Sequence, residues 1–529
     1  MYKANKKHLQ PLLISNVNEL PEKQRQRLEQ SWAGVFYREF FCRLNEEAFA
    51  KMYADNPSRP NTPVNVLIGL ETLKAGYGWS DEELYDHYCF DIQVRYALGY
   101  QDLHEGDFDI RTLYNFRRRL GQYNLEHGED LVAEAFINIT DQQIAAFKLH
   151  TGQQRMDSTQ IASNILDASR LELSVQAIQR LERLMNQEEK RQYADQLGPY
   201  TQGEPGQFIY HVKGGEANAE HLQRAGETLY ELLEKLKVKH KHEAEYQVVQ
   251  RFFTENYEVR ASKAIRTREP RELGSGSLQS LDDQEASFRK KGNRFYKGYV
   301  VNVSETCDPE NPLQLITQVQ VAPNNEEDAN LLCEAVPTIK ERMPLDTLYA
   351  DGGYGSPKAD QVLVQQQVEL YQSGIRGKAP KPEKLNLADF NLEADKLGEP
   401  IQITCPNGQN ASIGTGTSTD YIAYFETDIC MKCPLHLNGS CRVRRVKQDR
   451  SQFNWAFSQQ EFLWALRRKR HLWFKQQKHN PRAAVEAAMR SIKHAFPHGK
   501  LPVRGQIRVS QIMILATAMT NLRRIAHYQ

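Results

Sequence analysis

The sequence lacks any run of 18 or more consecutive apolar residues, so no transmembrane helix and no membrane partner are expected. The opening stretch, MYKANKKHLQPLL, also lacks the apolar core of a secretory signal peptide. We therefore expect a cytoplasmic protein. Its eight cysteines would then be reduced or bound to metal.

An excess of one charge is also missing from the chain as a whole, because its net charge is only +1. The charges are nevertheless unevenly distributed. Residues 441–529 contain 19 Lys and Arg against 3 Asp and Glu, so the first 440 residues carry about −15. A basic segment on an acidic protein indicates a nucleic-acid partner, although a solvated basic face that pairs with the acidic part is the alternative.

The stretch ALRRKRHLWFK (465–475) mixes cations with aromatic residues. This mixture favours contact with phosphates and bases over a plain solvated face. The predicted DNA-binding cations are Arg467, Arg468, Lys469 and Arg470.

The length of 529 residues and the hydrophobic content of 40% allow two to four domains. Residues 60–125 read as three short helices, the second opening with Ser80 and Glu83 as a capping box. They suit a helix-turn-helix-like DNA-binding unit or any small helical bundle. Further along, strands are expected at 153–164, 295–304, 313–322, 345–350 and 368–374, alternating late in the chain with helices. This order predicts a mixed α/β sheet covered by helices.

Acidic residues lie on or directly after two of these strands. Asp351 follows the strand at 345–350 and precedes Gly352 and Gly353, which add no bulk and permit unusual backbone conformations. An acid at the carboxyl end of a strand can face a ligand crevice, although a simple turn Asp is common. Asp157 lies on the short strand at 153–164.

A third acid is carried by the helix predicted at 481–496, where Asn480 can cap and Pro481 can take the first helical position. Arg482, Glu486 and Lys493 fall within about 40° of one another on this helix. The stripe therefore presents a cation, an anion and a cation. An ordinary amphipathic helix with a solvated polar face is the alternative.

Together these motifs resemble those of the DDE transposases of bacterial insertion sequences. The resemblance rests on MDST at Asp157, ADGGY at Asp351 and the Arg-x3-Glu-x6-Lys pattern that ends at Lys493. PVNVLIGLETLKAGYGWSDEELYDHY resembles the N-terminal domain of the same enzymes. SFRKKGNRFYKGYVVNVSETCD and the cysteine group resemble the insertion-sequence family numbered eleven eighty-two. The related signature has Tyr where this chain has His479, which puts that one DNA contact in doubt.

The resemblance implies a ribonuclease-H-like catalytic core formed by residues 150–165, 290–375 and 480–529. It also implies an N-terminal helical DNA-binding domain at 1–130, a helical insertion at 166–289 and a cysteine-rich, basic insertion at 376–480. The expected function is to bind the terminal inverted repeats of the element, cleave the phosphodiester bond and transfer the 3′ end to target DNA. A nuclease of the same fold without strand transfer, and a non-catalytic DNA-binding protein derived from a transposase, are the alternatives.

In this family's chemistry Asp157, Asp351 and Glu486 would be the catalytic residues and the ligands of two Mg²⁺ ions, or of Mn²⁺. Arg482, Lys493 and His479 would hold the DNA end. Gly352 and Gly353 would keep the strand end open for the DNA backbone. The partners would be double-stranded DNA, as element ends and as target, and a second copy of the chain in a homodimer.

Four of the eight cysteines form a group: Cys405, Cys430, Cys433 and Cys441. A C-x2-C pair with a third cysteine eight residues later is a plausible zinc site, and 376–440 contains few apolar residues to hold it otherwise. We therefore predict one structural Zn²⁺, with incidental reduced cysteines as the alternative. The remaining four cysteines occur in apolar patterns and are expected in the core: Cys42, Cys89, Cys307 and Cys333.

Overall fold

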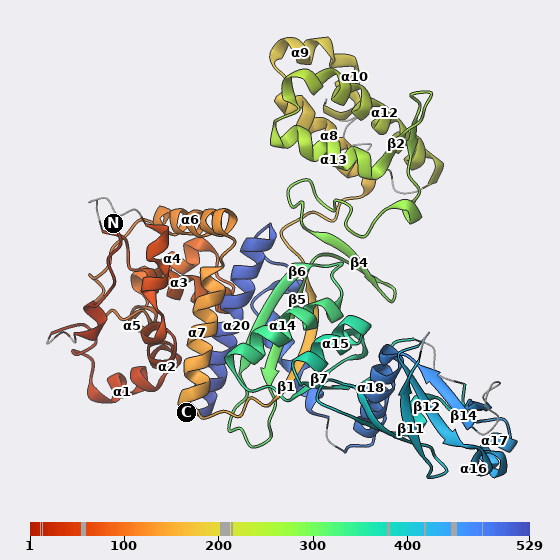
Figure 1. The fold of residues 1–529 in the computed structure, drawn as a ribbon. Helices are drawn as coiled ribbons and strands as arrows, with labels where there is room; N and C mark the ends of the chain where they lie inside the picture. Colours follow the sequence, from red (N-terminus) through yellow and green to blue (C-terminus); the bar gives the residue numbers. More distant parts are fainter. Residues whose placement is uncertain are drawn as a thin grey trace.

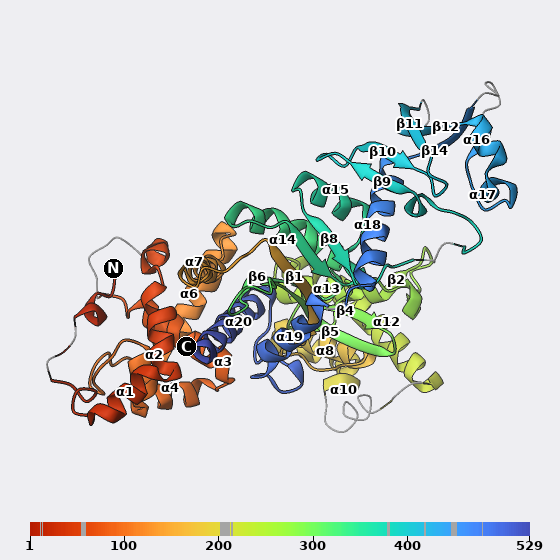
Figure 2. The same cartoon turned by 90° about the horizontal axis from the view of Figure 1, so that it is seen from below.

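A mixed β-sheet lies at the centre of the molecule, and three groups of elements surround it (Figures 1 and 2). The helices of the amino-terminal part lie on one side, a helical unit lies beyond β4, and a β-rich unit lies on the side opposite the amino terminus. Within the described part of the chain, every helix is too short or too polar to cross a membrane. This computed structural model describes residues 1–10, 12, 14–53, 60–201, 212, 215–377, 381–416, 419–445, 452–478 and 480–529.

The central sheet has the order β6-β5-β1-β7-β8, and β4 pairs with the first part of β5. Strand β5 is antiparallel to both β1 and β6, whereas β7 is parallel to both β1 and β8. This mixed sheet is compatible with a ribonuclease-H-like fold. The strands are β1 (Gln153–Ile161), β4 (Ser287–Lys291), β5 (Arg294–Thr306), β6 (Ile316–Pro323), β7 (Thr347–Ala350) and β8 (Glu369–Gln372).

The register between β1 and β7 fixes which residues become neighbours. Gln153 lies opposite Thr347, and Arg155 lies opposite Tyr349. Continued by two residues, the same register brings Asp157 beside Asp351, which directly follows β7. Adjacent strands lie about 4.8 Å apart, so the two acids are next to each other at the carboxyl end of β7.

Alternation along β1 sends its side chains to two different helical layers. Met156 packs in a cluster with α14 (Asp328–Arg342) and α15 (Pro357–Gln365). Ile161 packs instead in the core that contains α19 (Val485–Lys493) and α20 (Gln506–Tyr528). Asp157 and Thr159 share the parity of Ile161 and therefore face α19.

The amino-terminal helices share a single hydrophobic core with α19, α20 and strand β5. Helices α3 and α20 pack along each other, and α7 also contacts α20 and β6. The predicted capping box at Ser80 and Glu83 is confirmed at the start of α4. The helices are α1 (Glu22–Gln30), α2 (Trp32–Glu39), α3 (Val64–Tyr77), α4 (Asp81–Phe90), α5 (Ile92–Ala97), α6 (Arg111–His127) and α7 (Leu131–Ala146).

The segment between β1 and β4 folds around a core of its own, in which Leu229, Phe252 and Tyr257 are buried. It is mostly helical and ends with a small hairpin. Its elements are α8 (Arg170–Leu184), α9 (Gln187–Gln192), α10 (Ala194–Thr201), α12 (Gly215–His240), α13 (Ala244–Asn256), β2 (Tyr257–Val259) and β3 (Ile265–Thr267).

The cysteine-rich segment contains a second sheet of order β13-β14-β12-β11-β10-β9. The expectation that it lacks a core is wrong, because Phe390, Phe425, Phe453 and Phe457 are buried together. Its apolar residues are few but alternate along the strands, so they gather on one face. The elements are β9 (Asn391–Ala394), β10 (Pro400–Thr404), β11 (Asn410–Thr415), β12 (Tyr421–Glu426), α16 (Thr427–Lys432), α17 (Pro434–Leu437), β13 (Arg444–Arg445), β14 (Gln452–Phe457) and α18 (Gln459–Lys475).

The four cysteines expected in the core differ in burial. Cys307 and Cys333 are buried and Cys89 is half-buried, whereas Cys42 is exposed, so its prediction was wrong. Cys42 lies in a short 3₁₀ turn, Phe41–Arg43, where each residue turns about 120° from the last. Phe41 points inward there, and Cys42 therefore points to solvent.

Candidate active site

The carboxylate of Asp157 is largely buried and is held at both oxygens. Oδ1 accepts the backbone N–H of Ser158 at 2.9 Å, and Oδ2 accepts Nη2 of Arg482 at 3.1 Å. Burial raises the pKa of Asp157, the Arg482 cation opposes that shift, and the neighbouring Asp351 carboxylate adds to it. Asp157 and Asp351, 194 residues apart in the sequence, therefore lie close enough for their charges to influence each other.

A fully buried tyrosine, Tyr354, marks the place where the acids converge. Burial raises its pKa well above the usual range, and the carboxylates of Asp328, Asp157 and Asp351 raise it further, in that order. The Tyr354 hydroxyl donates to Oδ1 of Asn302 on β5 at 2.6 Å. Four polar residues from four elements thus surround one phenol at the end of the sheet.

Asp328 is a site residue that the sequence reasoning missed. It is buried at the start of α14, where its Oδ1 accepts the Ser158 hydroxyl at 2.9 Å. Its Oδ2 lies 3.3 Å from Arg289 and 3.6 Å from Arg376. The signal in the sequence was an acid near the start of the helix that follows the strand predicted at 313–322, which is common enough to pass as a simple cap.

The two glycines after Asp351 supply space and not unusual backbone angles. Among the described glycines with positive φ, neither Gly352 nor Gly353 appears. A Cβ on Gly353 would lie 2.7 Å from Oδ2 of Asp328 and 2.8 Å from Oδ1 of Asp351. The Gly353 N–H also donates to Asp351 at 2.7 Å. The missing side chain therefore lets the acids approach the turn, and the predicted conformational reason was wrong.

Helix α19 and the turn before it are anchored along one face of β1. Arg155 donates to the backbone oxygen of Pro481 at 2.8 Å, two residues before Asp157 binds Arg482. Two residues further, Thr159 Oγ1 accepts Nζ of Lys493 at 2.7 Å. Burial lowers the pKa of Lys493. Alternate residues of β1 thus hold both ends of the helix.

Glu486 lies on α19 between these two anchors, and its side chain is exposed. Asn480 caps the preceding turn and Pro481 takes its first position, as predicted, although this turn is 3₁₀ and α19 itself begins at Val485. His479 lies outside the described residues. The structure thus brings Asp157, Asp351, Arg482 and Lys493 together and puts Glu486 on the helix that crosses them.

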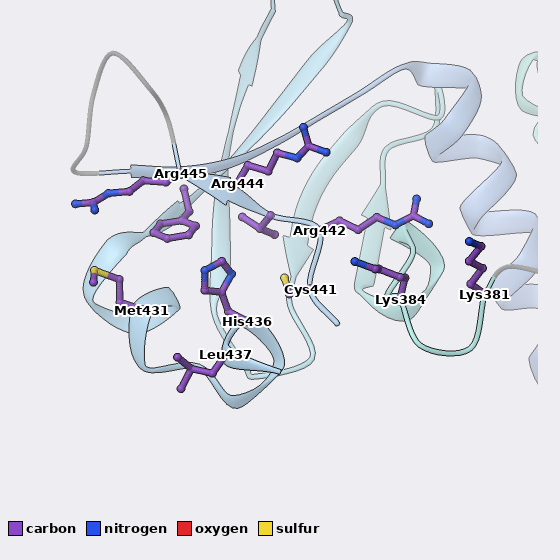
Figure 3. Close-up of a pocket in the computed structure, with 11 residues that line it drawn as sticks. Lys381, Lys384, Met431, His436, Leu437, Cys441, Arg442, Arg444 and Arg445 are labelled. Carbon is purple, nitrogen blue, oxygen red and sulfur yellow. The ribbon is translucent and has the colours of Figure 1, made fainter. Parts of the chain in front are cut away.

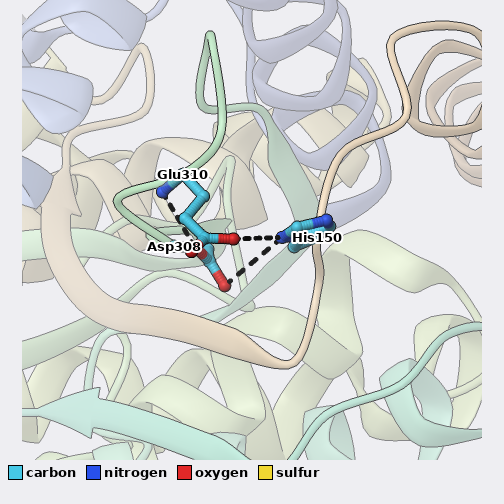
Figure 4. A group of neighbouring side chains, drawn as sticks. All are labelled: His150, Asp308 and Glu310. Atoms are coloured by element: carbon cyan, nitrogen blue, oxygen red, sulfur yellow. Dashed lines mark hydrogen bonds and ion pairs between the residues drawn. The ribbon is translucent and has the colours of Figure 1, made fainter.

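In the described part of the chain, the carboxylates of Asp157, Asp351 and Glu486 do not all lie within 4.8 Å of one another. The set that does is His150, Asp308 and Glu310 (Figure 4). His150 Nδ1 lies 3.8 Å from Asp308 and 3.6 Å from Glu310. His150 and Glu310 are exposed and Asp308 is half-buried. The group precedes β1 and follows β5, so it lies at the opposite end of the sheet from Asp351.

The donor set at the carboxyl end of β7 fits a divalent cation. Asp157 and Asp351 repel each other across adjacent strands, and a bound cation would relieve that repulsion. Carboxylate oxygens are the ligands that Mg²⁺ prefers. Arg482, Lys493 and Arg376 line the same end of the sheet with positive charge.

The basic run on α18 is mostly used inside the protein. Arg467 is buried and forms an ion pair with Asp360 at 3.1 Å, so its predicted contact with DNA is wrong. Lys469 donates to the backbone oxygen of Phe390 at 2.6 Å, and Arg470 pairs with Glu369 at 3.2 Å. Arg468 lies over the Trp464 ring. Helix α18 covers α15 and β8, and these contacts secure it there.

The four grouped cysteines line one small pocket of about 20 Å³. Burial raises the pKa of Cys430 to about 11, and the thiols of Cys441, Cys405 and Cys433 contribute to that rise. Cys405 Sγ accepts the backbone N–H of Gln409 at 3.4 Å. No three of these sulfurs, all of them within the described residues, lie within 4.8 Å of one another.

If Arg467 is structural, Arg467→Ala should lower the free energy of unfolding by about 3–5 kcal/mol, because Asp360 would stay buried without its partner. Burial already raises the pKa of Asp360 to about 6, against the effect of Arg467 and Arg470. Arg468→Ala, the matched control one residue away, should cost less than about 1 kcal/mol. Denaturant unfolding of both variants measures this, and equal stabilities would contradict the structural role.

A protein-family model described as "Transposase DDE domain" matches residues 404–526, which include the four grouped cysteines, Arg482, Glu486 and Lys493. The match covers less than a quarter of the chain. No curated protein and no solved structure matches the sequence. The match supports a DDE transposase, and therefore an enzyme of the nuclease and transposase class whose partner is DNA.

Proposed function

We propose that the chain is a transposase that binds the terminal inverted repeats of its element, cleaves the phosphodiester bond and transfers the 3′ end to target DNA. The observation that carries the proposal is the pairing of Asp157 with Asp351 at one end of the sheet, under the helix that bears Glu486. The family match over residues 404–526 supports it independently. The motifs point more narrowly to the insertion-sequence family numbered eleven eighty-two.

Asp157, Asp351 and Glu486 would hold two Mg²⁺ ions, or Mn²⁺. When bound, such ions activate an oxygen nucleophile and stabilise the leaving oxygen of the phosphodiester. Arg482 holds the Asp157 carboxylate in place and presents a cation beside it. Lys493, fixed on Thr159, presents a second cation to a phosphate at the same end of β1. Their charges would orient the DNA end against the acids.

The homodimer and the recognition of DNA ends by the amino-terminal helices are further parts of this proposal. These helices share a core with α20, so a duplex bound to them would be positioned rigidly relative to the acids. Purified protein, incubated with the terminal repeats that flank its gene and Mg²⁺, should yield cleaved ends and joined products on a denaturing gel. Cleavage without joining would indicate a nuclease. The absence of both cleaved and joined products would contradict the proposal.

Asp157→Asn, Asp351→Asn and Glu486→Gln should each slow cleavage at least about 1000-fold, because each removes a ligand that supports several kcal/mol of charge stabilisation. DNA binding should persist, since phosphate contacts come from cations. Asp346→Asn is the control: Asp346 is exposed and lies just before β7, far from the strand end that holds Asp351. Single-turnover cleavage and anisotropy measure the two properties. If any of the three variants cleaves DNA at the wild-type rate, the acid replaced in it is not a ligand of the catalytic metal ions.

Asp328 acts in this proposal as a positioning residue, through Ser158 and the turn at Gly353. Asp328→Asn should lower the cleavage rate about 10- to 100-fold and raise the Mg²⁺ concentration needed for half-maximal rate, as for other groups that orient metal ligands. The near-isosteric amide limits any effect on folding, which thermal unfolding checks. An unchanged Mg²⁺ dependence would show that Asp328 serves the fold alone.

For the cysteine group we propose one structural Zn²⁺. Two features support it: four thiols line one pocket, and that pocket's volume of about 20 Å³ is enough for a single small occupant. Zinc needs the thiolate forms, so the raised pKa of Cys430 predicts that binding weakens in acid and releases protons.

Protein purified without chelator should contain about one zinc per chain by elemental analysis. Cys433→Ser should lose the metal and destabilise the β9–β14 unit, because a structural zinc contributes folding energy. Cys42→Ser, which changes an exposed cysteine outside the group, should keep it. Zinc-free wild-type protein, or an undiminished zinc content in Cys433→Ser, would refute the site.

A further inference from the structure

A basic groove of about 890 Å³ lies on the cysteine-rich unit, between the segment that leaves β8 and strand β13 (Figure 3). Eleven residues line it, and none of them is Asp or Glu. Figure 3 shows the cations in a row along the groove, with Met431, His436 and Leu437 beside them. The five cations are Lys381, Lys384, Arg442, Arg444 and Arg445.

Four of these cations differ from those on α18 in what they contact. Lys381, Lys384, Arg442 and Arg444 are exposed and form no ion pair with the described part of the chain. On α18, by contrast, Arg467 and Arg470 are paired with acids, and Lys469 binds a backbone oxygen. The groove is therefore a place where positive charge is available to a partner.

The groove is connected to the acids by one short segment. Arg376 lies 3.6 Å from Asp328 and is largely exposed. Lys381 follows five residues later, so its Cα lies at most about 19 Å from that of Arg376. One turn of B-DNA spans about 34 Å. Lys381, at one edge of the groove, therefore lies within one helical turn of DNA from the acid cluster.

We propose that this basic groove binds the sugar–phosphate backbone of the duplex DNA that flanks the cleaved end. The inference rests on the proposed function, since it takes the partner of the acids to be DNA. Phosphates provide the negative charge that the acid-free lining matches. The exposed side chains of Met431 and Leu437 offer apolar contact to the sugars. The cysteine pocket beneath would hold the groove in shape, because Cys441 contributes to both.

The test compares full-length wild type with two groove variants by fluorescence anisotropy, on a duplex of about 40 bp, or four turns. One variant replaces only the loop pair, Lys381→Ala with Lys384→Ala, and so leaves the sheet untouched. The other adds Arg442→Ala and Arg444→Ala. The matched control replaces four exposed cations outside the groove by alanine: Arg183, Lys241, Arg260 and Lys396.

Each phosphate interaction that a substitution removes should reduce the slope of log K against log salt by about 0.9, so the pair should lower it by about 2 and the quadruple by about 3–4. Affinity for the duplex should fall at least about tenfold at 0.1 M salt, while the cleavage rate at saturating DNA stays near wild type. The control variant should match wild type in salt slope, affinity and cleavage rate. If the folded Lys381→Ala, Lys384→Ala variant binds the duplex with the affinity and salt slope of wild type, the proposed role of the groove is overturned.

Two further outcomes separate this inference from the proposed function. If wild type cleaves its ends and both groove variants retain affinity and salt slope, only the groove is refuted. If wild type neither binds the duplex nor cleaves it, both fail. The groove variants are also tested on an RNA duplex of the same length. If they lose affinity for the RNA duplex but bind the DNA duplex as wild type does, the inference is overturned, because the occupant of the groove would then be RNA.

Discussion

The parallel pairing of β1 with β7 is the constraint on which the site depends. It joins segments 194 residues apart and sets Asp157 beside Asp351. A slip of one residue would turn Asp157 toward α14 and Ser158 toward α19. The hydrogen bonds of Arg482 with Asp157, Lys493 with Thr159 and Asp328 with Ser158 would then all break together. Register, and not any single ligand, therefore defines the site.

The convergence of acids at the end of β7 determines where cations are placed around them. Three buried or half-buried acids at one strand end repel one another, and cations from distant parts of the chain offset that repulsion. Arg289 comes from β4, Arg376 from the segment after β8, and Arg482 from the turn before α19. Each of these three segments therefore contributes to the stability of the acid cluster. Of these three cations, only Arg376 has a largely exposed side chain.

Local sequence patterns were enough to predict several elements of the fold. Strand-ending acids, the β5–β6 hairpin and the Ser80 cap depend on neighbours in sequence, and all of these elements formed as expected. The exposed or paired state of a cation depends on distant partners instead. Arg467 reads as a DNA contact in its run of four cations, because nothing local indicates that Asp360, 107 residues earlier, is buried against it.

Asp328 escaped notice for the same reason, since its contacts with Ser158 and Arg289 come from other strands. The core of the cysteine-rich unit was missed because its aromatic residues are far apart in the sequence, before β9, on β12 and on β14, and meet only after folding. Alternation along each strand was visible in the sequence, but its importance depended on a sheet order that the sequence did not reveal.

The most direct measurement of the central claim uses Fe²⁺ in place of Mg²⁺. With ascorbate and peroxide, bound iron generates radicals that cut the polypeptide next to the metal, and mass spectrometry maps the cuts. If Asp157, Asp351 and Glu486 hold the ions, fragments should end near all three residues and disappear with excess Mg²⁺. Cuts confined to the neighbourhood of His150, Asp308 and Glu310, or no specific cuts, would contradict the account.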